Sequence, residues 1–278
     1  MNTISRSDFN YICELVRRRA AIVLEPDKAY LIETRLTPLA RQNGFDSLQA
    51  LIASLRLNAT DSLHHKVVEA ITIHETSFFR DAHPFETLQT TILPNLLARR
   101  SASQTLAIWC AACSSGQEPF SVAMLAREHF PALVKGRLRI IATDLSGAVL
   151  ARAREGLYSQ TEINRGLPAM LLTRYFDKQG LHWQIKPDIR RMVDFRQNNL
   201  AENWPLLPQM DIIFMRNVLI YFGLETKKAI LAKVRGILKP DGYLFLGSSE
   251  TTLNLDAGFE PISMGKTICY QLRQTKIS

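Results

Sequence analysis

One pair of cysteines has the spacing of a redox site, in the stretch WCAAC that ends at Cys113. A Cys-x-x-Cys pair just before a helix is typical of thioredoxin-type dithiol chemistry. Here SSGQEP follows Cys113, so the helix begins later and both cysteines fall in the end of a strand and the turn after it. We therefore interpret Cys110 and Cys113 as small residues packed beside a ligand pocket.

The cysteine count limits other chemistries. The chain has four cysteines, Cys13, Cys110, Cys113 and Cys269, which are too few for a disulfide framework. The single Cys-x-x-Cys has no second pair that would complete the ligands of a structural zinc ion. We expect no metal site.

A nucleotide-type ligand site is predicted where two expected strands end. The strand TLAIWCA leads through a turn with Gly116 into a helix, and the next strand, RLRIIATD, ends at Asp144. Such a turn needs a small residue where a ligand approaches the backbone, and a carboxylate at the second strand end can accept both ribose hydroxyls. The alternative for Asp144 is a helix N-cap before LSGAVL.

The elements that position these residues fall into two regions. Residues 1–75 have apolar residues at helical spacing and predict a bundle of about four helices. In the third of them, Asp46 with Gln49 resembles a capping box. From about residue 104, strands alternate with helices, which predicts a doubly wound α/β sheet whose last strand is KTICYQL. Residues 157–195 interrupt the alternation and predict a small β insertion.

Composition and charge restrict the class of protein. The chain of 278 residues is 46% hydrophobic and 22% charged, which is typical of a soluble globular protein. No apolar run approaches the ~18 residues of a membrane span, and MNTISRSDFN lacks a signal-peptide core. We expect a cytoplasmic protein without direct membrane insertion.

The net charge of +8 favours an acidic partner, with an ordinary solvated basic surface as the alternative. The basic residues form no long block and do not alternate with aromatic residues, so we expect no nucleic-acid binding.

Several longer stretches resemble the chemotaxis receptor methyltransferases, the CheR family. ITIHETSFFR resembles the family's T-x-N-E-T-x-F-F-R segment, and AACSSGQEPFSVAML resembles its C-S-S-G-E-E-P-Y-S segment. The other matches follow in the family's order: ATDLSGAVLARAREGLY, FRQNNL, DIIFMRNVLIYF and LKPDGYLFLGSSE. The resemblance covers nearly the whole chain.

The resemblance implies a fold and an activity. It implies a small N-terminal all-α domain (residues 1–75), which docks on receptors, and a linker that contacts the cofactor (76–103). A Rossmann-like, S-adenosylmethionine-dependent methyltransferase domain follows (104–278), with a small antiparallel β subdomain at about 172–195. The implied reaction methylates glutamate carboxylates of a chemoreceptor's acidic cytoplasmic helical bundle, giving methyl esters and S-adenosylhomocysteine. Basic residues of the first domain are the docking candidates: Arg17, Arg18, Arg19, Arg35 and Arg41.

The resemblance also assigns roles to residues. Asp144 holds the ribose hydroxyls, Asn199 and Leu200 flank the adenine, and Glu118 binds the α-ammonium of S-adenosylmethionine. The remaining assignments place Thr76 and Arg80 on its methionine part, Arg216 and Asn217 beside the cofactor, and Tyr221 with Arg216 near the reacting methyl group. Taken alone, Glu118 could be an acid of a first helical turn, Arg80 an exposed linker charge and Tyr221 a core residue.

The chain departs from the family pattern at several positions. His74 replaces an asparagine that contacts the cofactor; a neutral imidazole still offers one donor and one acceptor. Gln117 replaces a glutamate and Met215 a cysteine. DKQGLHWQIKP lacks the G-x-G of the loop with which some members bind a C-terminal receptor pentapeptide, so we expect independence from that tether. The alternative functions are methylation of a signalling protein outside chemotaxis and a non-catalytic module that binds S-adenosylmethionine.

Overall fold

The chain forms two units. The computed structural model describes residues 4–58, 60–101, 103–204 and 206–274. Met1–Ile73 and Tyr221–Lys227 form one unit, and His74–Ile220 with Lys228–Ser278 form the other. The short segment Tyr221–Lys227 joins the first unit through an antiparallel bridge between Ile22 and Phe222 and a hydrogen bond from Val23 N to the Tyr221 carbonyl oxygen (2.9 Å). It is the one part of the first unit that sequence analysis did not predict.

The first unit is helical, as predicted. It contains α1 (Arg6–Ala20), α2 (Ala29–Gln42), α3 (Leu48–Asn58) and α4 (Asp61–Ile71), with a 3₁₀ turn at Pro26–Lys28. Apolar side chains at helical spacing are buried between them, among them Ile12, Val16, Ile32, Leu36, Leu51 and Ile52. The predicted capping box of Asp46 and Gln49 is wrong: α3 begins at Leu48, so Ser47 is the residue whose hydroxyl accepts from Ala50 N (3.1 Å).

The second unit is built on a mostly parallel sheet of seven strands. Its strands are β1 (Leu106–Ala111), β2 (Leu138–Asp144), β6 (Val193–Gln197), β7 (Met210–Met215), β8 (Leu238–Leu246), β9 (Phe259–Met264) and β10 (Thr267–Leu272). The order is β6-β2-β1-β7-β8-β10-β9. β10 pairs antiparallel with both β8 and β9, and the other neighbouring strands pair parallel. β1 and β7 are buried at every position, as expected of central parallel strands. β9 was not predicted. It is an edge strand, and all its residues except Phe259 are half-buried or exposed.

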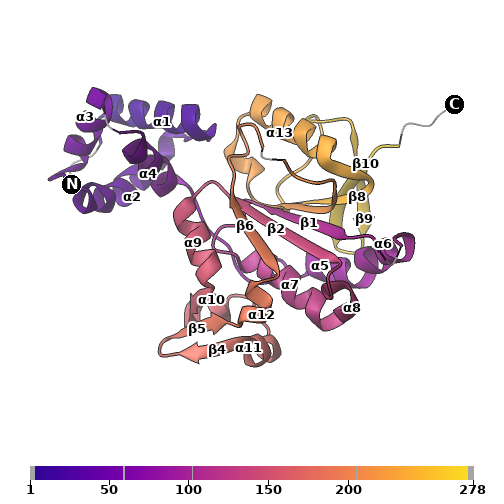
Figure 1. Ribbon diagram of the computed structural model, residues 1–278. Coiled ribbons are helices and arrows are strands. Elements are labelled where there is room, and N and C mark those ends of the chain that lie inside the picture. The colour runs from indigo at the N-terminus through magenta and orange to yellow at the C-terminus, as the bar shows by residue number, and fades with distance from the viewer. Residues whose placement is uncertain (1–3, 59, 102, 205, 275–278) are drawn as a thin grey trace. The chain divides into compact units, whose positions relative to one another are not determined.

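Helices cover both faces of this sheet, which confirms the predicted Rossmann-like α/β architecture (Figure 1). α7 (Gln117–His129), α9 (Gly147–Glu155) and the continuous helix made of α5 (His83–Thr87), a π-helical turn (Leu88–Ile92) and α6 (Leu93–Arg99) lie on one side. α13 (Leu224–Ile237) lies on the other; the short α8 (Pro131–Val134) follows α7. After β6 the chain returns to the far side of β1 and forms β7, so the strand order reverses between β1 and β7. Ligands of such sheets bind at the carboxyl ends of the strands where this reversal occurs.

The predicted β insertion is a separate three-stranded antiparallel sheet in the order β3-β5-β4. It comprises β3 (Leu157–Ser159), β4 (Phe176–Gln179) and β5 (His182–Ile185), with α10 (Gln160–Asn164), α11 (Ala169–Tyr175) and α12 (Pro187–Arg190) beside it. It therefore extends back to Leu157, while the last part of the predicted β stretch forms β6 of the main sheet.

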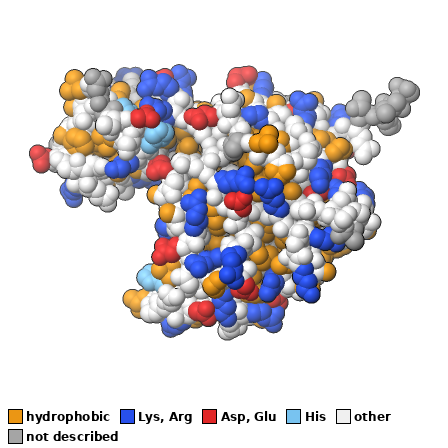
Figure 2. Space-filling view, viewed as in Figure 1, with side chains coloured by type: hydrophobic (Ala, Val, Ile, Leu, Met, Phe, Trp, Pro, Cys, Tyr) orange, Lys and Arg blue, Asp and Glu red, His pale blue; other side chains and the backbone are white. Residues whose placement is uncertain are grey.

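Three further features concern the surface charge, membrane-spanning helices and groups of metal-binding side chains. On the face seen in Figure 2, Lys and Arg side chains form several separate groups among acidic ones. Across the residues that the structure describes, no helix is both long and apolar enough to span a bilayer. In the same residues, no three or more His, Cys, Asp or Glu side chains are grouped so that they could hold a metal ion.

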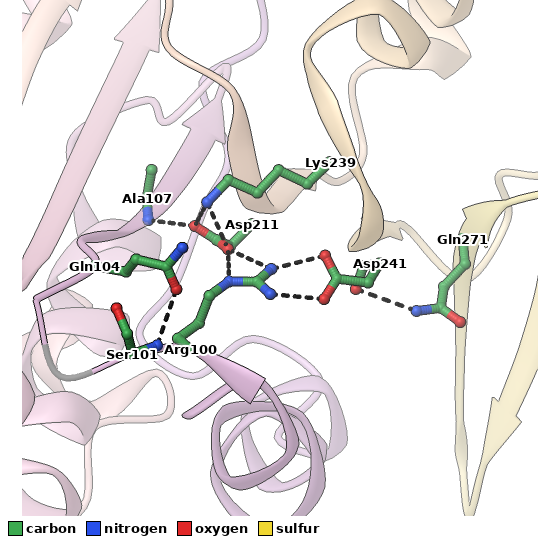
Figure 3. A network of polar contacts seen from close by, with 8 residues as sticks. All are labelled: Arg100, Ser101, Gln104, Ala107, Asp211, Lys239, Asp241 and Gln271. Carbon is green, nitrogen blue, oxygen red and sulfur yellow. Dashed lines mark hydrogen bonds and ion pairs between the residues drawn. The ribbon is translucent and has the colours of Figure 1, made fainter. Parts of the chain in front are cut away.

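A buried ion network ties the strands together at the amino end of β7. The Asp211 carboxylate is fully buried and accepts from Arg100 (2.9 and 3.0 Å), from Lys239 (2.8 and 2.9 Å) and from Ala107 N (2.8 Å). Arg100 also forms two bonds of 2.7 Å with Asp241, so its guanidinium lies between two carboxylates (Figure 3). The guanidinium lowers the pKa of Asp241. β1, β7, β8 and the end of α6 are thereby joined through charged groups.

We expect Asp211→Asn to destabilise the second unit by about 3 kcal/mol, because it leaves two cations beside a neutral, buried amide. Urea unfolding followed by tryptophan fluorescence measures this directly, since Trp109, Trp183 and Trp204 all belong to that unit.

Asp194→Asn is the matched control. Asp194 pairs with Arg196 on β6, but 47% of its side chain is exposed. A change of about 0.5 kcal/mol or less is expected there. Equal effects of the two substitutions would contradict the structural role of the network.

Candidate functional site at the carboxyl edge of the sheet

Strained backbone gathers at the carboxyl edge of the parallel strands. Eight described non-glycine residues have positive φ angles, and six of them lie in three loops of the second unit. These are Phe79, Asp81 and Ala82 before α5, Ala112 and Ser114 after β1, and Asn217 after β7. Such conformations cost energy and concentrate at functional sites. The three loops therefore mark the candidate site.

Arg216 connects these loops through a buried cluster of charges. Its Nη1 donates to Glu118 (3.1 Å), and its Nη2 donates to Asp81 (2.5 Å) and to the Arg80 carbonyl oxygen (3.0 Å). The Arg216 side chain is 2% exposed and that of Glu118 is 12% exposed. Burial raises the pKa of Glu118, while Arg216 and Arg80 oppose that rise. Four residues from three separate parts of the sequence are thus brought together.

Asp144 ends β2 as predicted and is held by backbone amides. Its carboxylate accepts from Ser114 N (2.8 Å) and Ser146 N (3.0 Å). Burial raises the pKa of Asp144, and the Ser146 amide and the nearby His74 oppose the rise. The alternative reading as a helix N-cap is wrong, because α9 is capped by Ser146, whose hydroxyl accepts from Val149 N. Asp144 instead joins the loop after β1 to the end of β2.

Gly116 has a packing role that the sequence did not reveal. It adopts φ +93°, and a Cβ atom there would lie 3.0 Å from Ala153 of α9, 3.1 Å from Phe120 of α7 and 3.3 Å from Phe195 of β6. All three neighbours are side chains of the core. The glycine is therefore required by its backbone conformation and by close helix packing. The approach of a ligand to its backbone stays a prediction.

The two adjacent phenylalanines fasten the loop before α5. Phe78 is fully buried and packs edge-on against Tyr158 and Phe176 of the insertion, with ring centroids 5.0 and 5.7 Å apart. Phe79 packs against Phe85 (5.2 Å), and its amide donates to the Ser121 hydroxyl of α7 (2.9 Å). These contacts fix the backbone at Phe78 and Phe79, the two residues that immediately precede Arg80.

The segment with Asn199 and Leu200 follows β6 and is held by a residue of α13, Lys233. The Leu200 carbonyl oxygen accepts from Lys233 Nζ (2.6 Å) and from Trp204 Nε1 (3.1 Å). Lys233 Nζ lies 4.7 Å from the centroid of the Trp204 ring, which packs against Trp109 of β1. The backbone N–H of the neighbouring Asn198 donates to the Asp144 carbonyl oxygen (2.9 Å), which joins this segment to β2.

The remaining predicted residues are distributed between the two units. His74 opens the second unit, and its carbonyl oxygen accepts from the Ser114 hydroxyl (2.8 Å). Thr76 is half-buried in the same loop. Tyr221 belongs to the helical unit, where its carbonyl oxygen accepts from Val23 N (2.9 Å). The place of its hydroxyl near the reacting methyl group stays a prediction. Of the departures from the family pattern, Gln117 and Met215 are both buried.

The two cysteines of WCAAC are free and buried. Burial raises the pKa of both thiols well above the ordinary value. The Glu118 carboxylate adds to the rise at both cysteines, and the Asp144 carboxylate adds to it at Cys113. A dithiol site needs a lowered thiol pKa. The interpretation of Cys110 and Cys113 as packing residues agrees with this environment.

Three buried polar atoms at this edge have no hydrogen-bond partner within the described part of the chain: Nε of Arg216, Oδ1 of Asn217 and Nδ2 of Asn198. Buried polar groups in folded proteins are almost always paired. Donors and an acceptor are thus left open beside two carboxylates. This set fits S-adenosylmethionine, which presents an ammonium, a carboxylate, ribose hydroxyls and an adenine.

Sequence analysis missed three residues of this edge. Asp81 completes the charge cluster of Arg216, Ser114 joins Asp144 to His74, and Glu250 accepts several backbone amides of the segment after β7. Asp81 and Ser114 adjoin motifs that were recognised, and Glu250 ends the quoted LGSSE. No spacing rule points to the partners named here, which lie 30 or more residues away in the sequence.

Known proteins resemble the chain over nearly its full length. Chemotaxis protein methyltransferase 1 of Pseudomonas aeruginosa is 41% identical over 274 residues, covering 97% of this chain and 99% of that protein. Chemotaxis protein methyltransferase Cher2 of Pseudomonas putida is 40% identical over 271 residues, covering 96% and 98%. Chemotaxis protein methyltransferase 1 of Vibrio cholerae is 36% identical over 275 residues, covering 98% of each chain.

Family models and the structure share the boundary after residue 73, and they differ only at Tyr221–Lys227, which the structure assigns to the helical unit. The all-alpha domain of CheR methyltransferase matches residues 7–72, and the SAM binding domain of CheR methyltransferase matches residues 74–268, which contain the whole carboxyl edge described above. With a helical unit, a sheet edge suited to S-adenosylmethionine and both domains matched in order, the chain belongs to the CheR methyltransferase family.

Proposed function

We propose that this S-adenosylmethionine-dependent methyltransferase methylates glutamate side chains in the cytoplasmic domain of chemoreceptors. The observation behind the proposal is the charge cluster of Arg216 and Glu118, beside which the buried Arg216 Nε and Asn217 Oδ1 lack partners. The relatives are named chemotaxis protein methyltransferases, which supports a receptor of that system as the substrate.

Each polar group of the site has a proposed role toward the cofactor. Asp144 accepts hydrogen bonds from the ribose hydroxyls, and Glu118 accepts them from the α-ammonium. Arg80 binds the carboxylate of the cofactor's methionine part. Thr76 and His74 complete the methionine side, and Asn199 and Leu200 flank the adenine. Arg216 and Asn217 lie beside the cofactor, and Tyr221, together with Arg216, lies near the transferred methyl group.

The chemistry asks little of the protein beyond alignment. Bound S-adenosylmethionine supplies a methyl group activated by its positive sulfonium. A glutamate acceptor is already ionised at neutral pH, so its oxygen forms the new C–O bond without a general base, and S-adenosylhomocysteine leaves with the sulfur electron pair. The residues of the chain need only hold the carboxylate in line and exclude water. Orientation of this kind contributes up to roughly 7–11 kcal/mol.

Recognition of the receptor is assigned to the basic side chains of the helical unit. Arg35 has a structural task, since it donates to the carbonyl oxygens of Thr72 (2.6 Å) and Ala70 (3.3 Å) at the end of α4. Arg17 pairs with Glu14 and Arg19 with Asp61. Arg18 and Arg41 are exposed and are the better docking candidates.

Recognition is proposed to need no receptor tether. β4 and β5 pair from Gln179 with His182, so Gly180 and Leu181 alone form their turn. A two-residue turn is too short to serve as the loop that would bind a pentapeptide.

The proposed reaction predicts an alkali-labile label. With methyl-labelled S-adenosylmethionine and a purified receptor cytoplasmic fragment, label is expected in the receptor and is released as methanol by mild base, because it sits in a methyl ester. A fragment without its C-terminal pentapeptide is expected to be labelled equally well.

Tyr221→Phe separates catalysis from cofactor binding in this assay. It is expected to lower the labelling rate while the affinity for S-adenosylhomocysteine stays unchanged. Base-stable label would assign the enzyme to another acceptor atom. No label in any receptor fragment, with tight cofactor binding, would favour a signalling protein outside chemotaxis or a non-catalytic module.

Asp144→Asn is expected to weaken binding of S-adenosylhomocysteine about 10- to 100-fold at neutral pH, since charged hydrogen bonds contribute about 1.5–3 kcal/mol. Wild-type affinity should also fall with acidification, because burial raises the pKa of Asp144 and it therefore takes up a proton above the ordinary aspartate range. Burial favours the neutral form in the folded protein, so this protonation does not unfold the chain. Isothermal titration between about pH 7.5 and 5.5 measures both effects.

Asp194→Asn on the neighbouring strand is the control and should bind like the wild type. An unchanged affinity in Asp144→Asn, or an equally steep pH dependence in that variant, would contradict the role of Asp144.

The combined substitution Arg18→Glu and Arg41→Glu is expected to raise the apparent KM for the receptor fragment severalfold, with a weaker salt dependence, because attraction to an acidic surface is lost. The affinity for S-adenosylhomocysteine should not change. Lys135→Glu, an exposed charge of the other unit, is the matched control. An unchanged KM would exclude these two arginines from docking.

A further inference from the structure

Glu250, in the loop after β8, is a buried carboxylate surrounded by backbone amides. It is 9% exposed. Its Oε2 accepts from Gly247 N (2.6 Å) and Asn217 N (2.7 Å). Its Oε1 accepts from the next three amides along the chain, those of Leu219 (2.7 Å), Val218 (2.9 Å) and Ile220 (3.3 Å). One side chain therefore holds four consecutive residues, 217–220.

Close packing reinforces this contact. A Cβ atom on Gly247 would lie 2.7 Å from both Asn217 Nδ2 and Glu250 Oε2, and 2.9 Å from Asn217 N. Only a glycine allows the loop after β8 to approach the loop after β7 this closely. Asn217 itself has φ +58°, a conformation that a side-chain-bearing residue adopts at some cost. The amide contacts with Glu250 keep it there.

The residues that Glu250 holds adjoin those proposed to contact the cofactor. Arg216 immediately precedes the clamped segment, and Asn217 is its first residue. The unpartnered Arg216 Nε and Asn217 Oδ1 lie there as well. A carboxylate that simply capped the 3₁₀ turn at Leu219–Tyr221 would have no reason to bond the amides of both Asn217 and Gly247.

We propose that Glu250 is a positioning residue of the methyltransferase site. It orients the Arg216–Asn217 pair toward the amino-acid part of S-adenosylmethionine without touching the cofactor. This inference rests on the proposed function of the same pair. It differs from a structural role in one respect: loss of the clamp should be felt in cofactor affinity and turnover more than in stability.

The test compares two buried carboxylates associated with one strand. Glu250→Gln keeps the side-chain shape but turns an NH₂ group toward amides that need an acceptor. Asp211→Asn makes the same change at the amino end of β7, five residues from Arg216 and so roughly 16 Å away along the strand. We would measure the melting temperature, the dissociation constant of S-adenosylhomocysteine and kcat at saturating S-adenosylmethionine for both variants and the wild type.

Glu250→Gln is expected to weaken S-adenosylhomocysteine binding about tenfold or more and to lower kcat, since two unpaired groups of the site lose their orientation. Asp211→Asn should lower the melting temperature at least as much, yet keep the affinity within about twofold of wild type. If Glu250→Gln fails to fold, Gly247→Ala, which presses on the same contacts, is expected to show the same loss of affinity.

Three results would overturn the inference. Wild-type affinity and kcat in Glu250→Gln, or in Gly247→Ala where that variant replaces it, would show that the clamp does not orient the site. Equal losses of affinity in Glu250→Gln and Asp211→Asn would show a structural role alone. A wild-type protein that binds no S-adenosylhomocysteine would instead refute the proposed function on which the inference rests.

Discussion

The guanidinium of Arg216 is removed from solvent, and the site depends on how its charge is compensated. Glu118 comes from the first turn of α7, Asp81 from the loop before α5, and Arg216 itself from the end of β7. A buried guanidinium is stable only with well-placed partners. The three segments are therefore held together at the point where the strand order reverses, next to the strands β1 and β7. Displacement of either carboxylate would remove one of the two charges that compensate the buried Arg216.

The two ends of β7 use charge in opposite ways. At the amino end, Asp211 is satisfied by Arg100, Lys239 and a backbone amide, and the network joins strands without leaving an open group. At the carboxyl end, Arg216 keeps an unpaired Nε beside an unpaired Asn217 oxygen. The charges at the amino end stabilise the fold. The carboxyl end retains unpaired polar groups that can form hydrogen bonds with a polar ligand. This division agrees with the placement of ligand sites at the carboxyl ends of parallel strands.

Much of the fold and part of the site were predictable because their signals are local. The apolar spacing of the first 75 residues, the alternation of strands and helices, and Asp144 at the end of β2 all lie within short stretches. The errors were also local: α3 is capped by Ser47, α9 by Ser146, and the half-exposed β9 lacks a clear strand pattern. Gly116 was singled out for the approach of a ligand, and the structure adds a packing reason for a glycine there, since a Cβ atom would meet core side chains.

The sequence by itself determined the family and the order of the domains, because the order of motifs and the short-range spacing of apolar residues are properties of the linear chain. Only the tertiary structure decided which charges compensate one another. Arg216 and Glu118 are 98 positions apart, and Arg100 and Asp211 are 111 apart. The structure also decided that Glu250 clamps residues 217–220 and that Tyr221–Lys227 joins the helical unit. Partners of this kind are selected by burial in three dimensions, since a buried charge or amide must find a complement wherever the fold brings one.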